Sequence, residues 1–344
     1  MLNLKPRQPK YRQQGFVLIL TLFILAAITI AVGYFAERVH QSLQLAQLRQ
    51  NLNDKLIGIN NTRSEILFRV STTYLSPYGI GQPDNVIALD DRPYAFEGTT
   101  VQLQDARGLL NINSVNDDQL FRFLGALDVP GDQRAHLADT LHDYIDADDL
   151  RRLQGAESAD YAALGLPPPR NRPLISPMEL KSIIGWRDMP SLWGDVPVTE
   201  LVTVSGITAI NPNTAPWQVI ASLPGATPEM AQAVVARRKL EPINTALLSQ
   251  MIGAALDTFP PQVIASPSDN IRITQRAIGM PWGIRYNIQL SPFSDISPWQ
   301  ISYFYRIEEK SDSSHPENAA KPSEFEKLPD RSVLPATAPI PSFL

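Results

Sequence analysis

Carboxylates are concentrated in one short stretch of the chain. Seven aspartate and glutamate residues lie between Asp139 and Asp160, with only Arg151 and Arg152 as arginines among them. Carboxylate oxygens near turns suit calcium, because this ion takes about six to eight oxygens in irregular geometry. No EF-hand spacing is present, so a solvated acidic face with local arginine pairing is the alternative. The candidate calcium ligands are Asp143, Asp146, Asp148, Asp149, Glu157 and Asp160.

The residue patterns that catalysis needs are missing from the sequence. The chain has no cysteine, which excludes disulfides, thiolate catalysis and cysteine-ligated zinc. Its four histidines form no H-E-x-x-H motif, and no G-x-S-x-G, P-loop or G-x-G-x-x-G sequence occurs. We therefore expect no enzymatic activity and no cofactor other than calcium. A membrane-anchored periplasmic enzyme is the alternative that the missing motifs disfavour.

A repeat at an offset of 100 residues flanks the acidic stretch. The sequence NINS at 111–114 matches NPNT at 211–214, and each copy continues into two helical patterns separated by a Pro-Gly turn. The Ser or Thr that ends each motif is expected to cap the first helix. The second copy resembles a helix-hairpin-helix unit, in which Arg237 and Arg238 are candidates for phosphate contact.

DNA contact and internal packing are the two interpretations of this repeat. The acidic stretch in the first copy opposes DNA contact, because like charges repel a phosphate backbone. The net charge of −5 also leaves the chain without a general basic surface. We predict packing modules and no nucleic acid partner.

One long helix is predicted near the start of the chain. Residues 16–36 are uncharged and mostly apolar, and a helix of this length is about 30 Å long, which matches the hydrocarbon thickness of a bilayer. Four basic residues between Lys5 and Arg12 place the N-terminus in the cytoplasm and the rest of the chain across the membrane. Apolar residues then recur at steps of three and four from Leu45 to Ile59, so an amphipathic helix is expected to continue to about Val70.

The remaining sequence predicts a helical block between strands. Residues 99–108 alternate like a half-buried strand, residues 109–260 carry helical patterns, and residues 271–307 return to strand-like sequence. The fold class is therefore α+β: a long N-terminal helix and a small antiparallel sheet, with an inserted, mainly helical domain. Residues 308–344 are rich in Pro, Ser and Glu, which predicts a disordered tail.

The sequence Gln14-Gly15-Phe16, the basic leader and the apolar helix resemble the N-terminus of type IV pilin-like precursors. The resemblance implies that a prepilin peptidase cuts after Gly15 and that Phe16 becomes the N-methylated terminus. Most pilins carry a glutamate four residues after the new terminus, where this chain has Leu20.

The segment between the two repeats resembles the type II secretion minor pseudopilin K family. The family pattern combines a D-x-D-D run, a G-A-E triplet, a tyrosine, an asparagine before a proline turn, and an E-L pair followed by glycine. The matching residues are Asp146, Asp148, Asp149, Gly155, Ala156, Glu157, Tyr161, Asn171, Glu179, Leu180 and Gly185. The resemblance implies calcium in the inserted domain, a helix start without glutamate, and other minor pseudopilins, of the I and J types, as partners.

The function implied by the resemblance is that of a minor pseudopilin at the tip of the type II secretion pseudopilus, contributing to its initiation and to export of folded proteins across the outer membrane. The expected location is the inner membrane, with a single pass and a periplasmic main domain. A DNA-binding competence-type pilin is the alternative function. The expected domains are a prepilin leader (1–15), a transmembrane and amphipathic stem helix (16–70), loop and sheet (71–108), an inserted domain with two helix-hairpin-helix-like repeats (109–265), the remaining strands (266–307) and the tail (308–344).

Overall fold

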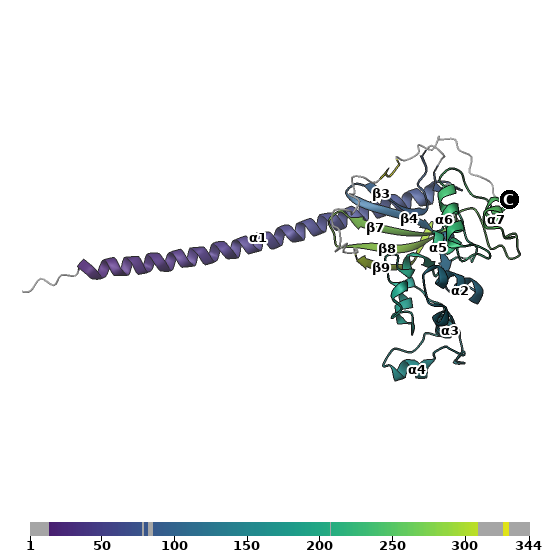
Figure 1. Ribbon diagram of the computed structural model, residues 1–344. Helices are drawn as coiled ribbons and strands as arrows, with labels where there is room; N and C mark the ends of the chain where they lie inside the picture. The colour runs from purple at the N-terminus through teal and green to yellow at the C-terminus, as the bar shows by residue number, and fades with distance from the viewer. Residues whose placement is uncertain (1–13, 78, 82–84, 207, 309–325, 330–344) are drawn as a thin grey trace, which may run out of the picture. The chain divides into compact units, whose positions relative to one another are not determined.

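The computed structural model describes residues 14–77, 79–81, 85–206, 208–308 and 326–329 (Figure 1). The chain divides into two units, one that ends at Ile57 and one that begins at Gly58. The predicted leader, apart from its last two residues, lies outside the described residues.

Helix α1 (Gln14–Thr72) forms the first unit and continues into the second. Every residue from Phe16 to Asp54 is exposed. The hydroxyls of Thr21 and Thr29 donate to backbone carbonyls one turn earlier in the same helix, at 2.9 and 2.8 Å. Polar groups that are satisfied within their own helix are compatible with a lipid environment. By length and composition, this helix is able to cross a membrane.

A six-stranded sheet lies at the centre of the second unit, in the order β10-β3-β4-β7-β8-β9. Neighbouring strands are antiparallel, except that β10 is parallel to β3. Strand β7 is buried along almost its whole length, as expected for a central strand covered on both faces. The strands are β3 (Asp90–Phe96), β4 (Thr99–Asp105), β7 (Asn270–Ala277), β8 (Trp282–Leu290), β9 (Trp299–Glu308) and β10 (Glu326–Lys327).

The last turns of α1 cover one face of this sheet. Ile66 is fully buried, and Thr62 Oγ1 lies 2.8 Å from Thr99 Oγ1 of β4. Alternate residues of a strand point to the same face, so Leu103, which pairs with Ile273, shares the face of Thr99. Both of these residues are fully buried, which makes this face the apolar core between helix and sheet.

Strand β10 corrects the prediction that residues 308–344 are disordered. Residues 326–327 pair with residues 94–95 of β3, and Leu328 is buried. Glu308 also belongs to a strand, since it ends β9. A two-residue strand has no detectable period, so the sequence pattern could not reveal it. The remainder of the tail lies outside the described residues.

The α-helices described in the second unit, apart from the end of α1, lie between β4 and β7. They share one core, which includes Phe123, Leu141, Trp186 and Val219. In Figure 1, α2, α3 and α4 lie below the labelled strands. The elements are η2 (Ala106–Gly108), α2 (Asp117–Ala126), α3 (Gly131–Ile145), α4 (Ser158–Ala163), η3 (Pro177–Ser182), η4 (Pro190–Leu192), η5 (Val198–Glu200), α5 (Trp217–Ile220), α6 (Pro228–Arg237) and α7 (Thr245–Ile252), with the parallel pair β5 (Leu110–Asn111) and β6 (Val202–Thr203); an antiparallel pair, β1 (Leu75–Ser76) and β2 (Gly79–Ile80), precedes the sheet.

Asp105, the last residue of β4, joins the two ends of this inserted block. Its side chain is fully buried, and its Oδ1 accepts hydrogen bonds from Arg107 N at 3.2 Å, Ser268 N at 2.8 Å and Ser268 Oγ at 2.7 Å. Its Oδ2 accepts from Asn211 Nδ2 at 2.9 Å and Thr214 Oγ1 at 3.0 Å. Because Ser268 lies just before β7, the exit of the block is bonded to its entrance.

The two N-x-N motifs make equivalent contacts, which gives the repeat a structural meaning. In each copy the first asparagine accepts a hydrogen bond from the backbone N–H of the second, at 3.1 Å. Asn113 then accepts from Leu174 N at 2.8 Å and donates to Leu174 O at 2.9 Å. Asn213 accepts from Ile243 N at 2.7 Å and donates to Ile243 O at 3.0 Å. The side-chain amide of each second asparagine therefore bonds both the N–H and the carbonyl of one distant residue, as the backbone of a neighbouring strand would.

The helices that follow these motifs are not capped as predicted. Asn116, and not Ser114, caps α2 by accepting a backbone N–H at 2.9 Å. Thr214 donates its hydroxyl to Asp105, and α5 begins after Pro216 without a side-chain cap. The expected caps were wrong because these hydroxyls lie in the turn that closes each motif. The helices of each pair, α2 with α3 and α5 with α6, are in contact.

Candidate functional site

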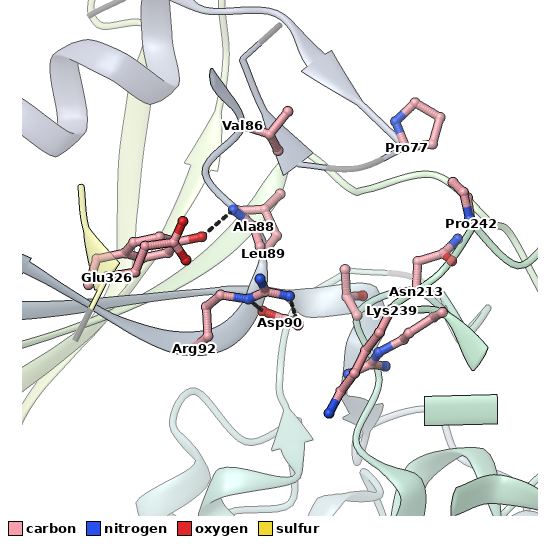
Figure 2. A pocket seen from close by; sticks show the side chains of 13 residues that line it. Pro77, Val86, Ala88, Leu89, Asp90, Arg92, Asn213, Lys239, Pro242 and Glu326 are labelled. Atoms are coloured by element: carbon pink, nitrogen blue, oxygen red, sulfur yellow. Dashed lines mark hydrogen bonds and ion pairs between the residues drawn. The ribbon is translucent and has the colours of Figure 1, made fainter. Parts of the chain in front are cut away.

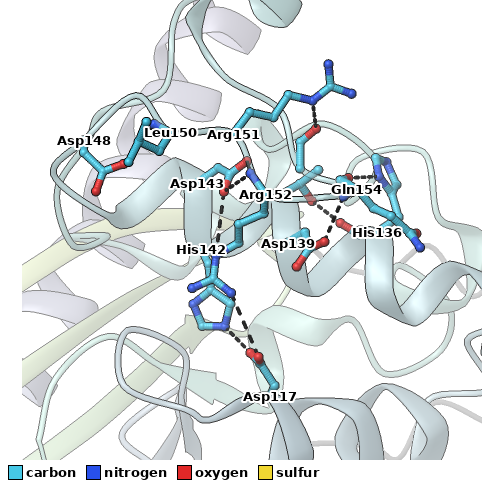
Figure 3. A network of polar contacts seen from close by, with 12 residues as sticks. Asp117, His136, Asp139, His142, Asp143, Asp148, Leu150, Arg151, Arg152 and Gln154 are labelled. Carbon is cyan, nitrogen blue, oxygen red and sulfur yellow. Dashed lines mark hydrogen bonds and ion pairs between the residues drawn. The ribbon is translucent and has the colours of Figure 1, made fainter.

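The predicted calcium ligands lie at the end of α3, in the loop that follows and at the start of α4. Figure 3 labels two of them, Asp143 and Asp148. Asp143 is fully buried, and its two oxygens accept from Arg152 N at 3.3 and 3.2 Å. Burial raises the pKa of Asp143, although the bond from Arg152 N acts in the opposite direction. A Cβ on Gly155 would lie 1.8 Å from Asp143 Oδ2, so only glycine leaves room for this carboxylate.

Glu157 has the least satisfied carboxylate of the group. Its exposed fraction is 6%; the backbone N–H of Asp160 approaches it in a capping box, but neither oxygen accepts a regular hydrogen bond from any residue that the structure describes. Burial, followed by the negative charges of Asp143 and Asp146, raises the pKa of Glu157 to about 7. A buried carboxylate without donors is costly unless it is protonated or meets a cation.

Two further oxygens of this segment are buried without a partner. They are Oδ1 of Asp146 and Oδ1 of Asn171. Asn171 donates its amide to Asp148 O at 3.1 Å and to Asp149 Oδ1 at 3.0 Å, which holds its side chain beside the acidic loop. Asn171 was not among the predicted ligands, and its only signal in the sequence was its place in the family pattern.

Besides Asp143, three more of the predicted ligands have partners. Asp160 Oδ1 lies 3.3 Å from Arg151 Nη1, and its Oδ2 accepts the N–H of Glu157 at 3.0 Å. Asp148 Oδ1 accepts a backbone N–H two residues later, at 2.8 Å, and Asp149 holds the Asn171 amide. Asp160 is therefore the least suited of the six to bind a metal.

The unpartnered atoms have the chemistry of a hard cation site. They are carboxylate and amide oxygens only, which are the donors that calcium prefers. Within the described ranges, no three acidic or histidine side chains are gathered as a ready-made metal site. Binding would thus require Asp146, Glu157 and Asn171 to move toward the ion.

Polar contacts hold the acidic loop against α2 and α3 (Figure 3). His142 Nε2 lies 2.7 Å from Asp117 Oδ1, and Arg152 Nη1 lies 3.9 Å from the other oxygen of the same carboxylate. His136 Nδ1 lies 2.7 Å from the carbonyl of Gln154. His136 and Arg152 therefore hold the loop in place, while His142 joins α3 to α2.

The arginines proposed for phosphate contact are used within the fold. Arg238 donates to the carbonyls of Pro212, at 3.1 Å, and Ala215. Arg237 forms an ion pair with Glu241 one turn later. This arrangement gives no support to DNA contact by the second helical pair.

Charged side chains join the sheet to the inserted block. Arg272 and Arg285 are exposed by only 1% and 2%. Arg285 Nη2 lies 2.7 Å from Glu200 Oε2, while Arg272 donates to the carbonyl of Glu200 at 2.8 Å and lies 3.3 Å from Asp91 Oδ2. Burial opposes ionisation of Glu200, but Arg285 and Arg272 outweigh it and lower the pKa of this carboxyl. The block is thus fixed to the sheet by buried charges.

A solved structure and a curated relative are similar to this chain. A chain of the GspK-GspI-GspJ complex from the enterotoxigenic Escherichia coli type 2 secretion system matches with a TM-score of 0.50 and 16% identity, over 77% of this chain and 99% of that chain. At this identity the match shows a shared fold. Type II secretion system protein K of Pectobacterium carotovorum subsp. carotovorum is 27% identical over 195 residues, which are 51% of this chain and 58% of the relative. The chain thus matches little more than half the length of that relative.

Two family models match the inserted block and its surroundings. Both describe protein K of the type II secretion system, and they match residues 95–190 and 210–265. These ranges contain the acidic loop and both N-x-N motifs with their clamped segments. The fold, the curated relative and the two models agree, and over these ranges the chain is similar to protein K of the type II secretion system.

Proposed function

We propose that this chain is a minor pseudopilin at the tip of the type II secretion pseudopilus, where it contributes to filament initiation and to export of folded proteins across the outer membrane. The observation that carries the proposal is the match of residues 95–190 and 210–265 to protein K models, in a chain that also has a long apolar helix. In this role the chain is a structural component and not an enzyme.

Other minor pseudopilins, of the I and J types, are the proposed partners. The similar solved chain comes from a GspK-GspI-GspJ complex. Along α1 of this chain, Leu45, Leu48 and Leu52 are exposed by 49%, 66% and 44%. An apolar stripe of this kind on a helix is stabilised by packing against another helix.

Membrane insertion and processing form the next part of the proposal. The first unit would cross the inner membrane once, with its N-terminus in the cytoplasm and the second unit in the periplasm. Prepilin peptidase would cut between Gly15 and Phe16, and Phe16 would be N-methylated. Mass analysis of the mature protein should find Phe16 first, and Gly15→Leu should retain the leader. Gly33→Ala is the control in the same helix, since a Cβ there meets nothing within 4 Å; a mature chain that starts beyond residue 36 would overturn the proposal.

The tip position is supported by Leu20. A glutamate at this position would neutralise the terminal amine of the subunit ahead, since an unpaired charge in lipid is costly. Leu20 cannot do so, which does no harm when no subunit lies ahead. The inserted block also adds bulk that a closely packed shaft would have to accommodate in every subunit.

Crosslinking in assembled pseudopili tests this position. We expect one copy at one end, in contact with the I- and J-type minor pseudopilins, and Leu20→Glu should allow incorporation along the shaft. Leu22→Glu is the matched control, because it adds the same charge at a position two residues away. Regular spacing of the unaltered protein along the shaft would refute the tip assignment.

We also propose that the acidic loop binds calcium. The supporting observation is that Glu157, Asp146 and Asn171 carry buried oxygens without donors, at the end of a run of carboxylates. An ion bound there would supply the positive charge that the loop lacks and would tie the end of α3 to the start of α4.

Thermal unfolding of the full chain in detergent tests calcium binding. Millimolar calcium should raise the melting temperature, because a ligand that binds only the folded state stabilises it. Glu157→Gln should abolish most of this increase, whereas Asp160→Asn should reduce it less, since Asp160 already pairs with Arg151. An equal response of both variants, or no response of the unaltered protein, would favour the solvated acidic face.

A further inference from the structure

A cavity of about 520 Å³ lies between strand β3 and the turn after α6, away from the acidic loop (Figure 2). One part of its wall is apolar and includes Val86, Leu89 and Pro242. The other part carries three cationic side chains, Arg92, Arg238 and Lys239. The cavity therefore has two chemically different sides within reach of one small ligand.

The positive charges at this cavity are only partly neutralised. Arg92 donates two hydrogen bonds to Asp90, both at 2.8 Å, so these two residues form a bidentate pair. Burial raises the pKa of Asp90, but the hydrogen bond and charge of Arg92 outweigh burial and lower it. Asp90 is thus ionised and already engaged by Arg92.

In the part of the chain that the structure describes, neither Arg238 nor Lys239 has a carboxylate within ion-pair distance. Arg238 makes its hydrogen bonds to backbone carbonyls, and burial lowers its pKa while Asp90 offsets this effect in part. The exposed ammonium of Lys239 makes no ion pair among the described residues. Glu326 is the second carboxylate at the wall, so three cations face two anions. The surplus of positive charge favours an incoming anion.

We infer that this cavity binds the C-terminal residue of a peptide, with its carboxylate at Arg238 and Lys239 and an apolar side chain against Val86 and Pro242. Guanidinium and ammonium groups bind carboxylates through charge-assisted hydrogen bonds. A free phosphate would leave the apolar side unused, and its larger charge would be repelled by Asp90. The inference does not rest on the tip assignment, because it depends only on this wall.

Fluorescence anisotropy with the full chain in detergent tests the site. The probe is the fluorescein-labelled peptide Gly-Ser-Gly-Val-Leu with a free C-terminus, compared with the same peptide as its C-terminal amide. The free acid should bind about tenfold more tightly, since one charged hydrogen bond is worth about 1.5 kcal/mol or more. Inorganic phosphate at equal concentration should displace the peptide less well than acetyl-leucine does.

Two variants separate a specific site from a general charge effect. Lys239→Ala should weaken binding of the free acid about threefold to fivefold and leave the amide unchanged. Arg237→Ala removes the same charge two positions earlier, from a residue that does not line the cavity, and should have little effect. Equal binding of acid and amide, equal effects of the two variants, or better displacement by phosphate than by acetyl-leucine would each overturn the inference.

Discussion

Asp105 is a buried carboxylate that is held by hydrogen bonds, with no ion pair to it in the described part of the chain. Its removal would leave several buried donors without an acceptor, which is more costly than the loss of the bonds themselves. We expect Asp105→Ala to lower the free energy of unfolding by about 3–5 kcal/mol, measured by denaturant titration. Asp257→Ala, at an exposed aspartate of the same block, is the control; equal losses would contradict a central role for Asp105.

The raised pKa of Glu157 makes the stability of the folded state depend on pH when calcium is absent. Its pKa is raised to about 7 in the folded state from 4.5, so the folded state holds this proton more tightly than the unfolded state does. Its contribution is fully present below about pH 4.5 and is lost as the pH rises to about 7. In a chelating buffer, the free energy of unfolding should fall by about 1–3 kcal/mol across this window, and Glu157→Gln should remove that decrease.

A stability curve that is the same for Glu157→Gln and for the unaltered protein would show that another group causes the pH dependence. Asp149→Asn is the control, because it removes a carboxylate from the same loop that already has a hydrogen-bond partner. Calcium should restore stability at neutral pH, because it favours the ionised carboxylate.

The sequence predicted which carboxylates lie in the acidic loop better than the contacts that each of them makes. A run of carboxylates is visible without a structure, and Asp143 and Glu157 were both among the predicted ligands. The pairing of Asp160 with Arg151 and the unpartnered oxygen of Asn171 depend on how the loop folds back. Neither contact leaves a period or a spacing that a sequence pattern can reveal.

The N-x-N clamps are the elements on which the two halves of the inserted block depend. Asn113 and Asn213 each satisfy one N–H and one carbonyl of a segment far along the chain. Replacement by alanine should therefore lower the free energy of unfolding by about 1–3 kcal/mol for each variant. Thermal unfolding of Asn113→Ala and Asn213→Ala checks this, and a loss from only one of them would show that the repeats are not equivalent in energy.

Elements with a periodic pattern of apolar residues were predicted well, and elements without such a pattern were not. The apolar run and the stripe from Leu45 predicted α1, which ends at Thr72, two residues beyond the expected end. Alternation predicted β4 and the strands after residue 270. Strand β10 and the cap at Asn116 were missed, because both are decided by contacts with distant or adjacent backbone and not by periodicity.

Within the second unit, buried charges set the position of the inserted block on the sheet. Glu200 faces two arginines that are almost completely buried. Glu200→Ala should lower the free energy of unfolding by about 3–5 kcal/mol, because it leaves these arginines with one counter-charge fewer. Since the pKa of Glu200 is lowered in the folded state, its contribution is present at neutral pH and is lost as the pH falls below about 4.5.

Unfolding of Glu200→Ala and of the control Glu229→Ala, compared between pH 3 and pH 7, would measure this contribution. Glu229 is exposed in the first turn of α6, far along the chain from the arginines. If the two variants lose the same stability at pH 7, the buried charges do not position the block.

The pairing of Asp105 with Ile271 has a consequence for the ancestry of this fold. The inserted block leaves β4 and returns on the adjacent strand β7, so for the sheet it is equivalent to the turn of a hairpin. Lengthening such a turn changes no strand order, and each doubling of its length costs only about 0.6 kcal/mol in closure entropy. A single insertion in an ancestral gene could therefore have added the block without disturbing the sheet, and descendants could alter or exchange it while the host sheet and helix stay the same.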